Sequence, residues 1–407
     1  MKRFVLFCVL LAAVCIPMTA LGETWAEFVA RAEHAMKDAR GDVVVRISED
    51  VGTAYNVPLT VPADVLLVIE GEGGSFSDML MTGGDVTLRG KGMSARQIRL
   101  EANRHSKNAH QAKLTIEKGV TIESLVSAGI FPMAAALEIY NYGQIKPRVN
   151  EKPLHLFVEP QRGDVSLTFH NYGEIESSGV DCGLEISGYS EGRNCAITVH
   201  NEGVIKTEGL FDIYGVTYRN GAIRIDFTNS GSISTRGDIW IGPFASINNN
   251  GFDVSVENLR GGVIENTSTA GSAVSIWYAN PIRSGAARFM NAGTVRAPGS
   301  PVQILEDTAN RGTFDFSNTG ELVSGNPNAP TVEITIWQSV ERMRDIITEE
   351  KFEGQASRWL ERSGFHALPA GTRIRALLQA YNWKDWDVFT VSDKIVESRG
   401  LEALVAE

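Results

Sequence analysis

The chain has 407 residues, of which 43% are hydrophobic and 8% aromatic, and this composition excludes an intrinsically disordered protein. Its 38 Lys and Arg residues are outnumbered by 49 Asp and Glu residues, so the net charge is −11. A surface this acidic excludes a protein that binds nucleic acid through a basic stripe.

Residues 1–22 are typical of a secretory signal peptide. A basic pair at residues 2–3 precedes an apolar run over residues 4–16, and Ala-Leu-Gly at residues 20–22 provides a small-x-small cleavage site. The apolar run is shorter than the roughly 20 residues that span a bilayer, which disfavours a retained anchor. We expect export to the periplasm, the cell surface or the medium, with no transmembrane segment after the leader is removed.

Residues 23–40 are predicted to form an amphipathic helix. Its apolar side chains fall on one helical stripe: Trp25, Phe28, Val29, Ala32 and Met36. Such a helix can lie on a membrane surface. It can also cover the apolar end and the unpaired strand edges of a repeat domain, and we favour this capping role.

Residues 41–123 alternate short apolar runs with turn residues. VVVRI, VLLVIEG, DVTLRG and KLTIEKGVTI are separated by segments that contain Gly, Pro, Asn or Asp. This pattern is typical of strands joined by turns and predicts the irregular first coils of a solenoid.

Between residues 124 and 336 one phrase recurs at intervals of 27 to 33 residues. Its copies are LEIYNYGQI, LTFHNYGEI, ITVHNEGVI, IDFTNSGSI, VSVENLRGGVI, ARFMNAGTV and FDFSNTGEL. A fixed period of this length with strand-type alternation predicts a stacked β-solenoid. Each unit contains three strand-like pieces, such as EIESS, GLEIS and CAITVH, and therefore predicts a triangular coil.

An asparagine ends the first strand of each repeat. Alternation along VSLTFHN points this residue inward at a corner, and coils stacked about 4.8 Å apart would align the amides in a hydrogen-bonded ladder. The glycine that follows is predicted to adopt a positive φ. The predicted ladder consists of Asn141, Asn171, Asn201, Asn229, Asn258, Asn291 and Asn318.

Removal of the leader leaves two cysteines, Cys182 and Cys195. Both lie in one predicted coil, and exported chains favour disulfides, so we predict a bridge between them. Two buried free thiols are the alternative. No further ligands at metal spacing accompany them, so we expect no metal site.

Residues 337–407 change character. WQSVERMRDIITEEKFEGQASRWLERSGF has a helical pattern, and the segment that follows mixes helix and strand signals around Trp383 and Trp386. We predict a mixed, partly helical C-terminal cap. The alternative is a small binding or oligomerisation module that presents the tryptophan pair.

The Asn-x-Gly-x-Ile phrase resembles the repeats of autotransporter passenger regions and haemagglutinin-type adhesins. Residues 41–336 as a whole are similar to pectin-lyase-like proteins. The resemblance implies an all-β fold, a single-stranded right-handed parallel β-helix. It also implies a non-catalytic, adhesin-like or structural role, in which an elongated face binds a glycan or a cell-surface protein.

The same resemblance includes enzymes that cleave acidic polysaccharides, so a polysaccharide lyase or glycoside hydrolase is the alternative function. The catalytic candidates are Asp181, Asp212 and Asp238, which follow successive ladder asparagines by 10, 11 and 9 residues. Stacked in a column, they could bind Ca²⁺ or act as an acid–base pair. Asp is also a frequent turn residue, and we prefer that interpretation.

Aromatic and arginine residues follow the second strand-like segment of successive coils. They could stack sugar rings or anchor a partner, or they could pack beside the lateral turns. The candidate ligand-binding residues are Tyr189, Tyr218, Phe244, Trp277, Tyr278, Arg219 and Arg283. His170 and His200, which precede ladder asparagines, are expected to point outward on a solvated face.

Overall fold

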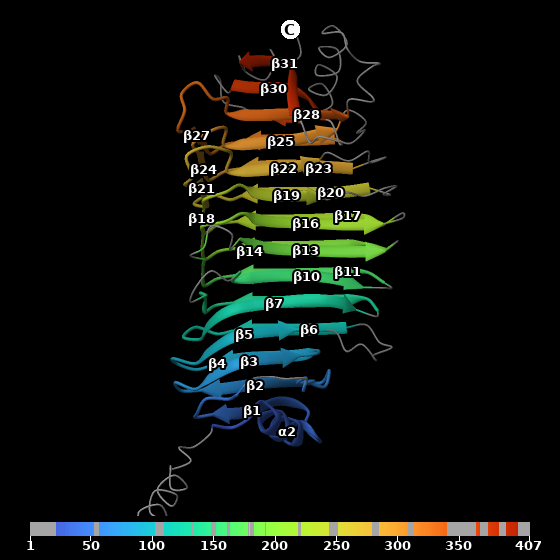
Figure 1. Ribbon diagram of the computed structural model, residues 1–407, viewed down its shortest axis with the longest axis vertical. Coiled ribbons are helices and arrows are strands. Elements are labelled where there is room, and N and C mark those ends of the chain that lie inside the picture. The colour runs from blue at the N-terminus through green and yellow to red at the C-terminus, as the bar shows by residue number, and fades with distance from the viewer. Residues whose placement is uncertain are drawn as a thin grey trace, which may run out of the picture.

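Figure 1 shows the computed structural model as a tall column of stacked strands, with helix α2 at its N-terminal end. All of the predicted signal peptide except its last residue lies outside the described part. The structure describes residues 22–52, 57–101, 110–131, 133–147, 152–160, 163–177, 179, 183–191, 193–218, 221–243, 251–278, 285–307, 313–339, 364–366, 373–381 and 388–397.

Each regular coil has three faces. One coil consists of β14 (Cys195–Asn201), β15 (Val204–Thr207) and β16 (Phe211–Tyr218). β14 belongs to a 12-stranded sheet, whereas β15 and β16 lie in two separate columns of a 19-stranded sheet. We call these the first face, the short-strand face and the long-strand face. The stacking confirms the predicted all-β architecture, a right-handed parallel β-solenoid.

The strands of each face pair in parallel with those of the next coil. The first face contains, besides β14, β1 (Gly41–Ile47), β2 (Val65–Gly71), β4 (Gly84–Arg89), β6 (His110–Ile116), β8 (Ala135–Asn141), β11 (Val165–Asn171), β17 (Ala222–Asn229), β20 (Gly251–Asn258), β23 (Gly285–Asn291), β26 (Thr313–Asn318) and β29 (Gly364–His366). The short-strand face contains, besides β15, β9 (Gln144–Ile145), β12 (Glu174–Glu176), β18 (Ser232–Thr235), β21 (Val263–Asn266), β24 (Thr294–Ala297) and β27 (Glu321–Ser324).

The long-strand face runs the length of the column. Its first strands are long enough to cover two faces, since β7 pairs with both β9 and β10. Besides β16, this face contains β3 (Ser75–Met81), β5 (Ser94–Leu100), β7 (Thr121–Phe131), β10 (Leu154–Pro160), β13 (Leu184–Glu191), β19 (Ile239–Pro243), β22 (Val274–Tyr278), β25 (Val302–Asp307), β28 (Val332–Ser339), β30 (Arg373–Tyr381) and β31 (Val388–Glu397).

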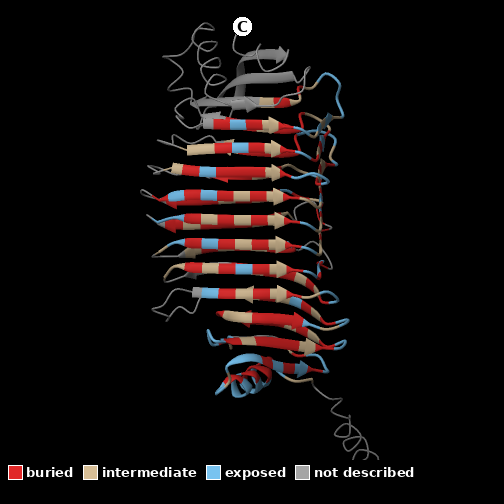
Figure 2. Ribbon diagram, turned by 180° about the vertical axis from the view of Figure 1, so that it is seen from behind, coloured by how far each residue is buried: buried red, intermediate tan, exposed pale blue. Residues whose placement is uncertain are grey.

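Alternating side chains build the core. In β14 every second residue from Cys195 to Asn201 is buried, and Figure 2 shows the same alternation along the first face. Register aligns Phe169, Val199 and Phe227 in one inward column, and all three are fully buried. Burial of each such side chain stabilises the fold by roughly 1.5–3 kcal/mol. The periodic apolar pattern therefore fixes which face of each strand points inward.

The predicted asparagine ladder is confirmed. The seven asparagines are at most 4% exposed. The Nδ2 of each of the first six donates to Oδ1 of the asparagine in the next coil, over 2.7–2.8 Å. The ladder begins at Asn141 because its partner in the preceding coil is Ile116, which offers no donor. We call this edge between the first and short-strand faces the Asn corner.

The prediction of a positive φ is wrong for the Asn-corner glycines except Gly261, which belongs to the longer corner after Asn258 and has φ +88°. Gly173 and Gly203 are not among the described glycines with positive φ. A Cβ on Gly173 would lie 2.0 Å from the Gly143 carbonyl oxygen, and one on Gly203 would lie 2.1 Å from that of Gly173. Glycine is needed because successive backbones touch at this corner, not because the backbone is left-handed.

A second polar ladder follows the opposite end of the short strands, which we call the second corner. Ser177 Oγ lies 2.8 Å from Thr207 Oγ1, and Thr207 pairs in register with Thr235. Asn266 occupies the next position. This ladder was not predicted, although Ser or Thr stands six residues after Asn171, Asn201 and Asn229.

The N-terminal helix covers the first coils as predicted. α2 (Trp25–Met36) begins with a capping box between Thr24 and Glu27. Its apolar stripe is buried, and the Trp25 and Phe28 rings lie 5.9 and 5.2 Å from the ring of Phe76. No helix in the described ranges is both long and apolar enough to cross a membrane.

The described parallel strands continue past residue 336, the predicted end of the solenoid. β28 continues to Ser339, β29 extends the first face, and β30 pairs in parallel with β28. The apolar residues of VEITIW alternate as in a β-strand, and this pattern continues past residue 336. β31 pairs antiparallel to β30 and therefore ends the parallel stacking. Most of the stretch predicted to be helical, and the Trp383–Trp386 pair, lie outside the described residues.

Cys195 is a buried cysteine on the inward side of β14 and forms no disulfide with another described residue. Its Sγ donates to the Gly188 carbonyl over 3.5 Å, and burial raises the pKa of the thiol to about 12. Its expected partner, Cys182, lies outside the described residues, and the bridge stays a prediction.

Candidate functional site

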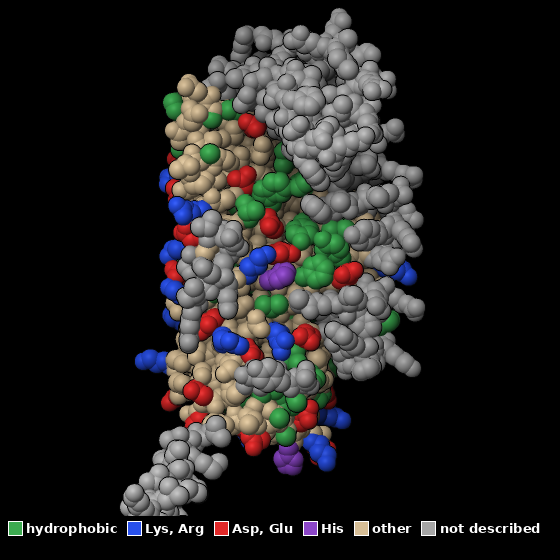
Figure 3. Space-filling model, in the orientation of Figure 1, with side chains coloured by type: hydrophobic (Ala, Val, Ile, Leu, Met, Phe, Trp, Pro, Cys, Tyr) green, Lys and Arg blue, Asp and Glu red, His purple; other side chains and the backbone are tan. Residues whose placement is uncertain are grey.

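An outward column of side chains runs along the long-strand face, and we call it the polar column. One residue from each of seven consecutive strands contributes to it, because the parallel register is unbroken from β10 to β28. Its members are His155, Glu185, Asp212, Trp240, Ser275, Gln303 and Glu333. Figure 3 shows this face, where hydrophobic side chains gather beside acidic ones about halfway along the solenoid.

Glu185 is surrounded by donors. Its Oε1 accepts from Tyr214 Oη over 2.8 Å and from Ser187 Oγ over 3.2 Å. Its Oε2 lies 3.2 Å from Lys152 Nζ and 3.4 Å from His155 Nε2. The hydrogen bond from His155, with those from Tyr214 and Lys152, lowers the pKa of Glu185 to about 2. Glu185 is therefore a fixed anion with every acceptor position used.

Asp212 pairs in register with Glu185 from the next coil, but its hydrogen bonding and the direction of its pKa shift are the opposite of those of Glu185. No hydrogen bond joins its carboxyl to another described residue. Burial, with a smaller contribution from the charge of Glu185, raises its pKa to about 6. A half-buried carboxyl without a protein partner is costly, and a ligand hydroxyl can satisfy it.

An apolar pocket of about 270 Å³ opens beside Asp212, and we call it the aromatic pocket. The rings of Trp240 and Trp277 meet edge to face, with centroids 4.9 Å apart and an interplanar angle of 70°. Tyr214 and Pro243 complete the wall. Because an edge-to-face pair leaves ring surface uncovered, the pocket offers an aromatic platform next to a carboxyl group.

The predicted Asp column does not form. Register places Asp212 opposite Trp240, whereas Asp238 comes two residues earlier, in the turn before β19. Two residues along a strand correspond to about 7 Å, too far for one stacked column. Asp181 lies outside the described residues. Within the described part, no three His, Cys, Asp or Glu side chains gather as a metal site.

Of the predicted ligand-binding residues, Trp277 lines the aromatic pocket. Tyr189 lies nearby, with its ring centroid 4.9 Å from Phe157 and 6.2 Å from Tyr214. Tyr218 and Tyr278 end β16 and β22, and their side chains are not described. The remaining predicted residues lie outside the described part: Arg219, Phe244 and Arg283.

Most of the residues that build this site were not predicted from the sequence. They are Lys152, His155, Glu185, Tyr214 and Trp240. Counting residues from the ladder asparagines could have revealed part of the site. Asp212 and Trp240 each stand 11 residues after a ladder asparagine, which places them in the same register.

His170 and His200 point outward as predicted, but they belong to a stack of rings. His170 stacks between Tyr140 and His200, with ring centroids 4.8 Å from each. Beside them, the rings of Tyr142 and Tyr172 stack on each other, with centroids 4.6 Å apart. The stacked rings join adjacent coils, and Tyr142 and Tyr172 remain 44% and 36% exposed.

Comparisons with protein-family models, with curated proteins and with solved structures find no match for this chain. A function for this chain is therefore inferred from the site itself.

Proposed function

We propose that the protein is an exported, non-catalytic glycan-binding protein of an adhesin-like or structural kind, and that the aromatic pocket is its principal subsite. The observation that supports this most directly is the carboxyl group of Asp212, half-buried and without a hydrogen-bond partner among the described residues, beside the ring surface of Trp240 and Trp277. The Asn-x-Gly repeats support the finer comparison with autotransporter passenger and pectin-lyase-like β-helices.

A sugar ring has the chemistry that this pocket matches. Its C–H face packs on an aromatic ring, and its hydroxyl groups hydrogen-bond to a carboxylate. The polar column supports a linear ligand, because its residues repeat once per coil and all of them except the buried Ser275 are partly exposed. Six steps of about 4.8 Å place its ends roughly 29 Å apart, long enough for several sugar units in a row.

A glycoside hydrolase is the second candidate function, and the separated pKa values of Glu185 and Asp212 favour it. In that reaction Asp212 would protonate the glycosidic oxygen while Glu185 activated a water molecule. The four donors on Glu185 oppose this role, because a general base needs a free lone pair. We therefore propose binding ahead of hydrolysis.

The test is a glycan-array screen of the protein from residue 23 onward, followed by mass spectrometry of the retained glycans. We expect intact glycans to be retained, and Trp277→Ala to weaken retention at least tenfold because stacking surface is lost. Tyr142→Ala, an exposed aromatic residue in the ring stack, is the matched control and should bind like the wild type. Shortened products would establish hydrolysis instead, and unchanged binding by Trp277→Ala would remove the aromatic pocket from the site.

A further inference from the structure

The aromatic pocket combines one carboxyl group with aromatic rings. Among the described residues that line it, Asp212 is the only acidic side chain, and none is Lys, Arg or His. The side chains of Asp212, Trp240 and Trp277 are each partly exposed, so a ligand can reach all three. A group that binds here therefore meets a carboxylate on one side and indole rings on another.

The charged groups around Asp212 do not neutralise it. Its register partners on the two adjacent coils are Glu185 and Trp240. Burial, and then the charge of Glu185, raise the pKa of Asp212, whereas Lys152 lowers it with the smallest of the three effects. The Nζ of Lys152 lies 3.2 Å from Oε2 of Glu185, so its charge is already paired with that carboxylate. Asp212 is thus left without an ion-pair partner in the described part of the chain.

The rings beside Asp212 suit a cation as well as a sugar ring. The face of an aromatic ring attracts positive charge, and Trp does so most strongly. Trp240 and Trp277 meet edge to face, with centroids 4.9 Å apart, and Tyr214 adds a third ring to the lining. Aromatic rings around a cavity are the arrangement with which proteins recognise ammonium groups.

A hydroxyl group satisfies only part of this site. It can donate a hydrogen bond to Asp212, but it brings no charge to offset that of a partly buried carboxylate. An ammonium group supplies both, because a charge-assisted hydrogen bond is stronger than a neutral one. The same group also gains from the ring faces of Trp240 and Trp277. The pocket therefore matches an amino group better than a hydroxyl group.

We infer that the aromatic pocket selects glycans with free amino groups, and that the ammonium group of an unacetylated amino sugar binds between the carboxylate of Asp212 and the rings of Trp240 and Trp277. This inference rests on the proposed function, because the sugar ring that carries the amine occupies the same pocket. The amine takes up its proton readily beside a carboxylate. The net charge of −11 also attracts a polycationic glycan from a distance.

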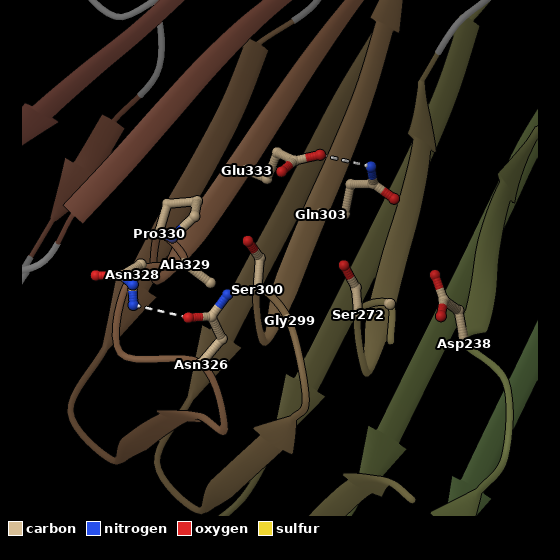
Figure 4. Close-up of a pocket in the computed structure, with 11 residues that line it drawn as sticks. Asp238, Ser272, Gly299, Ser300, Gln303, Asn326, Asn328, Ala329, Pro330 and Glu333 are labelled. Carbon is tan, nitrogen blue, oxygen red and sulfur yellow. Dashed lines mark hydrogen bonds between the residues drawn. The ribbon is translucent and has the colours of Figure 1, made fainter. Parts of the chain in front are cut away.

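Asp238 offers a comparison within the same protein. It lies in the turn before β19, in the next coil from Asp212, and Figure 4 shows it at one end of the residues that line a second hollow, of about 480 Å³. Its carboxylate accepts from Ser275 Oγ over 2.7 Å and from Asn266 Nδ2 over 3.3 Å. Because the protein supplies these donors, Asp238 needs a ligand less than Asp212 does.

The experiment uses matched oligosaccharides of glucosamine, N-acetylglucosamine and glucose, with the same length and linkage. Calorimetry at pH 7, where Asp212 with its pKa of about 6 is mostly ionised, measures the affinity of each ligand. The wild type should bind the glucosamine ligand at least tenfold more tightly than the other two. Asp212→Asn keeps the shape and an acceptor but removes the charge. It should lose this preference while its affinity for the glucose ligand changes by less than about twofold.

Asp238→Asn is the matched control, because it removes a negative charge one coil away from a residue that does not line the aromatic pocket. It should keep the preference for the glucosamine ligand. Thermal melting checks that each variant is folded. Loss of the preference in both Asp→Asn variants would mean that general acidity selects the ligand, which overturns the inference.

The remaining outcomes separate the two proposals. If Trp277→Ala weakens binding of all three ligands and Asp212→Asn keeps the preference, selection of the amino group is wrong and glycan binding by the aromatic pocket stands. A wild type that binds the glucosamine ligand no more tightly than the other two also overturns the inference alone. If neither Trp277→Ala nor Asp212→Asn changes the binding of any ligand, both proposals fail.

Discussion

The Asn corner and the long-strand face are built by the same coils but follow opposite rules. At the Asn corner, identical residues repeat in identical register, and the amides of the five interior ladder asparagines, from Asn171 to Asn291, bond to the coils on both sides. On the long-strand face, the polar column changes residue type at almost every step. The repeated corner stabilises the solenoid, whereas the varied face carries the groups that a ligand can use.

The difference appears in the energetics of single groups. Asn201 is buried but satisfied, so its burial costs little. Asp212 is half-buried and unsatisfied, so the folded protein bears the cost of its charge. Proteins retain such unfavourable groups mainly where they function. Mutations at the two regions should therefore change stability in opposite directions.

The largest effect is expected at the Asn-corner glycine Gly203. In Gly203→Ala, the new Cβ would lie 2.1 Å from the Gly173 carbonyl oxygen, and two coils must separate. We expect the free energy of unfolding to fall by about 3 kcal/mol, measured by urea denaturation.

Gly261→Ala is the control for this prediction. Gly261 has φ +88°, and a Cβ added there would have no atom within 4 Å, so only backbone strain applies, about 1 kcal/mol. Equal losses in the two variants would show that close approach is not what requires glycine at the Asn corner.

Removing one asparagine of the ladder should cause the next largest loss of stability. Asn201→Ala removes one amide and leaves the Nδ2 of Asn171 and the Oδ1 of Asn229 without their ladder partners. We expect a loss of about 1–3 kcal/mol in the free energy of unfolding. Glu202→Ala, an exposed neighbour in the same corner, should change it by less than about 0.5 kcal/mol. No difference between these two variants would mean that the ladder is not a stabilising element.

The smallest expected effect is an increase in stability, caused by neutralising Asp212 on the long-strand face. Burial raises the pKa of Asp212 from its ordinary 3.8 to about 6, so the folded protein holds this proton more tightly than the unfolded chain. The contribution of the protonated Asp212 carboxyl to the free energy of unfolding is therefore fully present below pH 3.8 and is lost as the pH rises to 6. Asp212→Asn should therefore raise the free energy of unfolding by about 1–2 kcal/mol at pH 7.

The gain should vanish near pH 3.5, where the wild-type carboxyl is also neutral. Asp253→Asn, at an exposed position of β20, should show no gain at either pH. Chemical denaturation at both pH values makes the measurement. Destabilisation by Asp212→Asn at pH 7 would show that the carboxylate has a structural partner rather than a role in binding.

The fold could be predicted because the information is local and repeated. Asn201 and its equivalents recur with the same inward alternation, and one repeat is enough to orient the next. The role of these glycines was predicted wrongly because it depends on the contact between Gly173 and Gly203. These residues are 30 positions apart, and no local sequence pattern reveals the contact.

The site could be predicted only in part, because it depends on exact register. Asp212 and Asp238 differ by two residues in their distance from the ladder, and this difference separates them by about 7 Å. Trp277 was found through its residue type alone. Glu185 and Trp240 were missed because their importance comes from neighbours in adjacent coils.

The most direct test of where the ligand binds is amide hydrogen exchange with and without a saturating glycan from the array. The account predicts slower exchange in β16, β19 and β22, with no change in the strands of the first face that end at the Asn corner. Protection confined to the Asn corner would contradict it, because the repeated corner would then be the binding surface and the varied face would not.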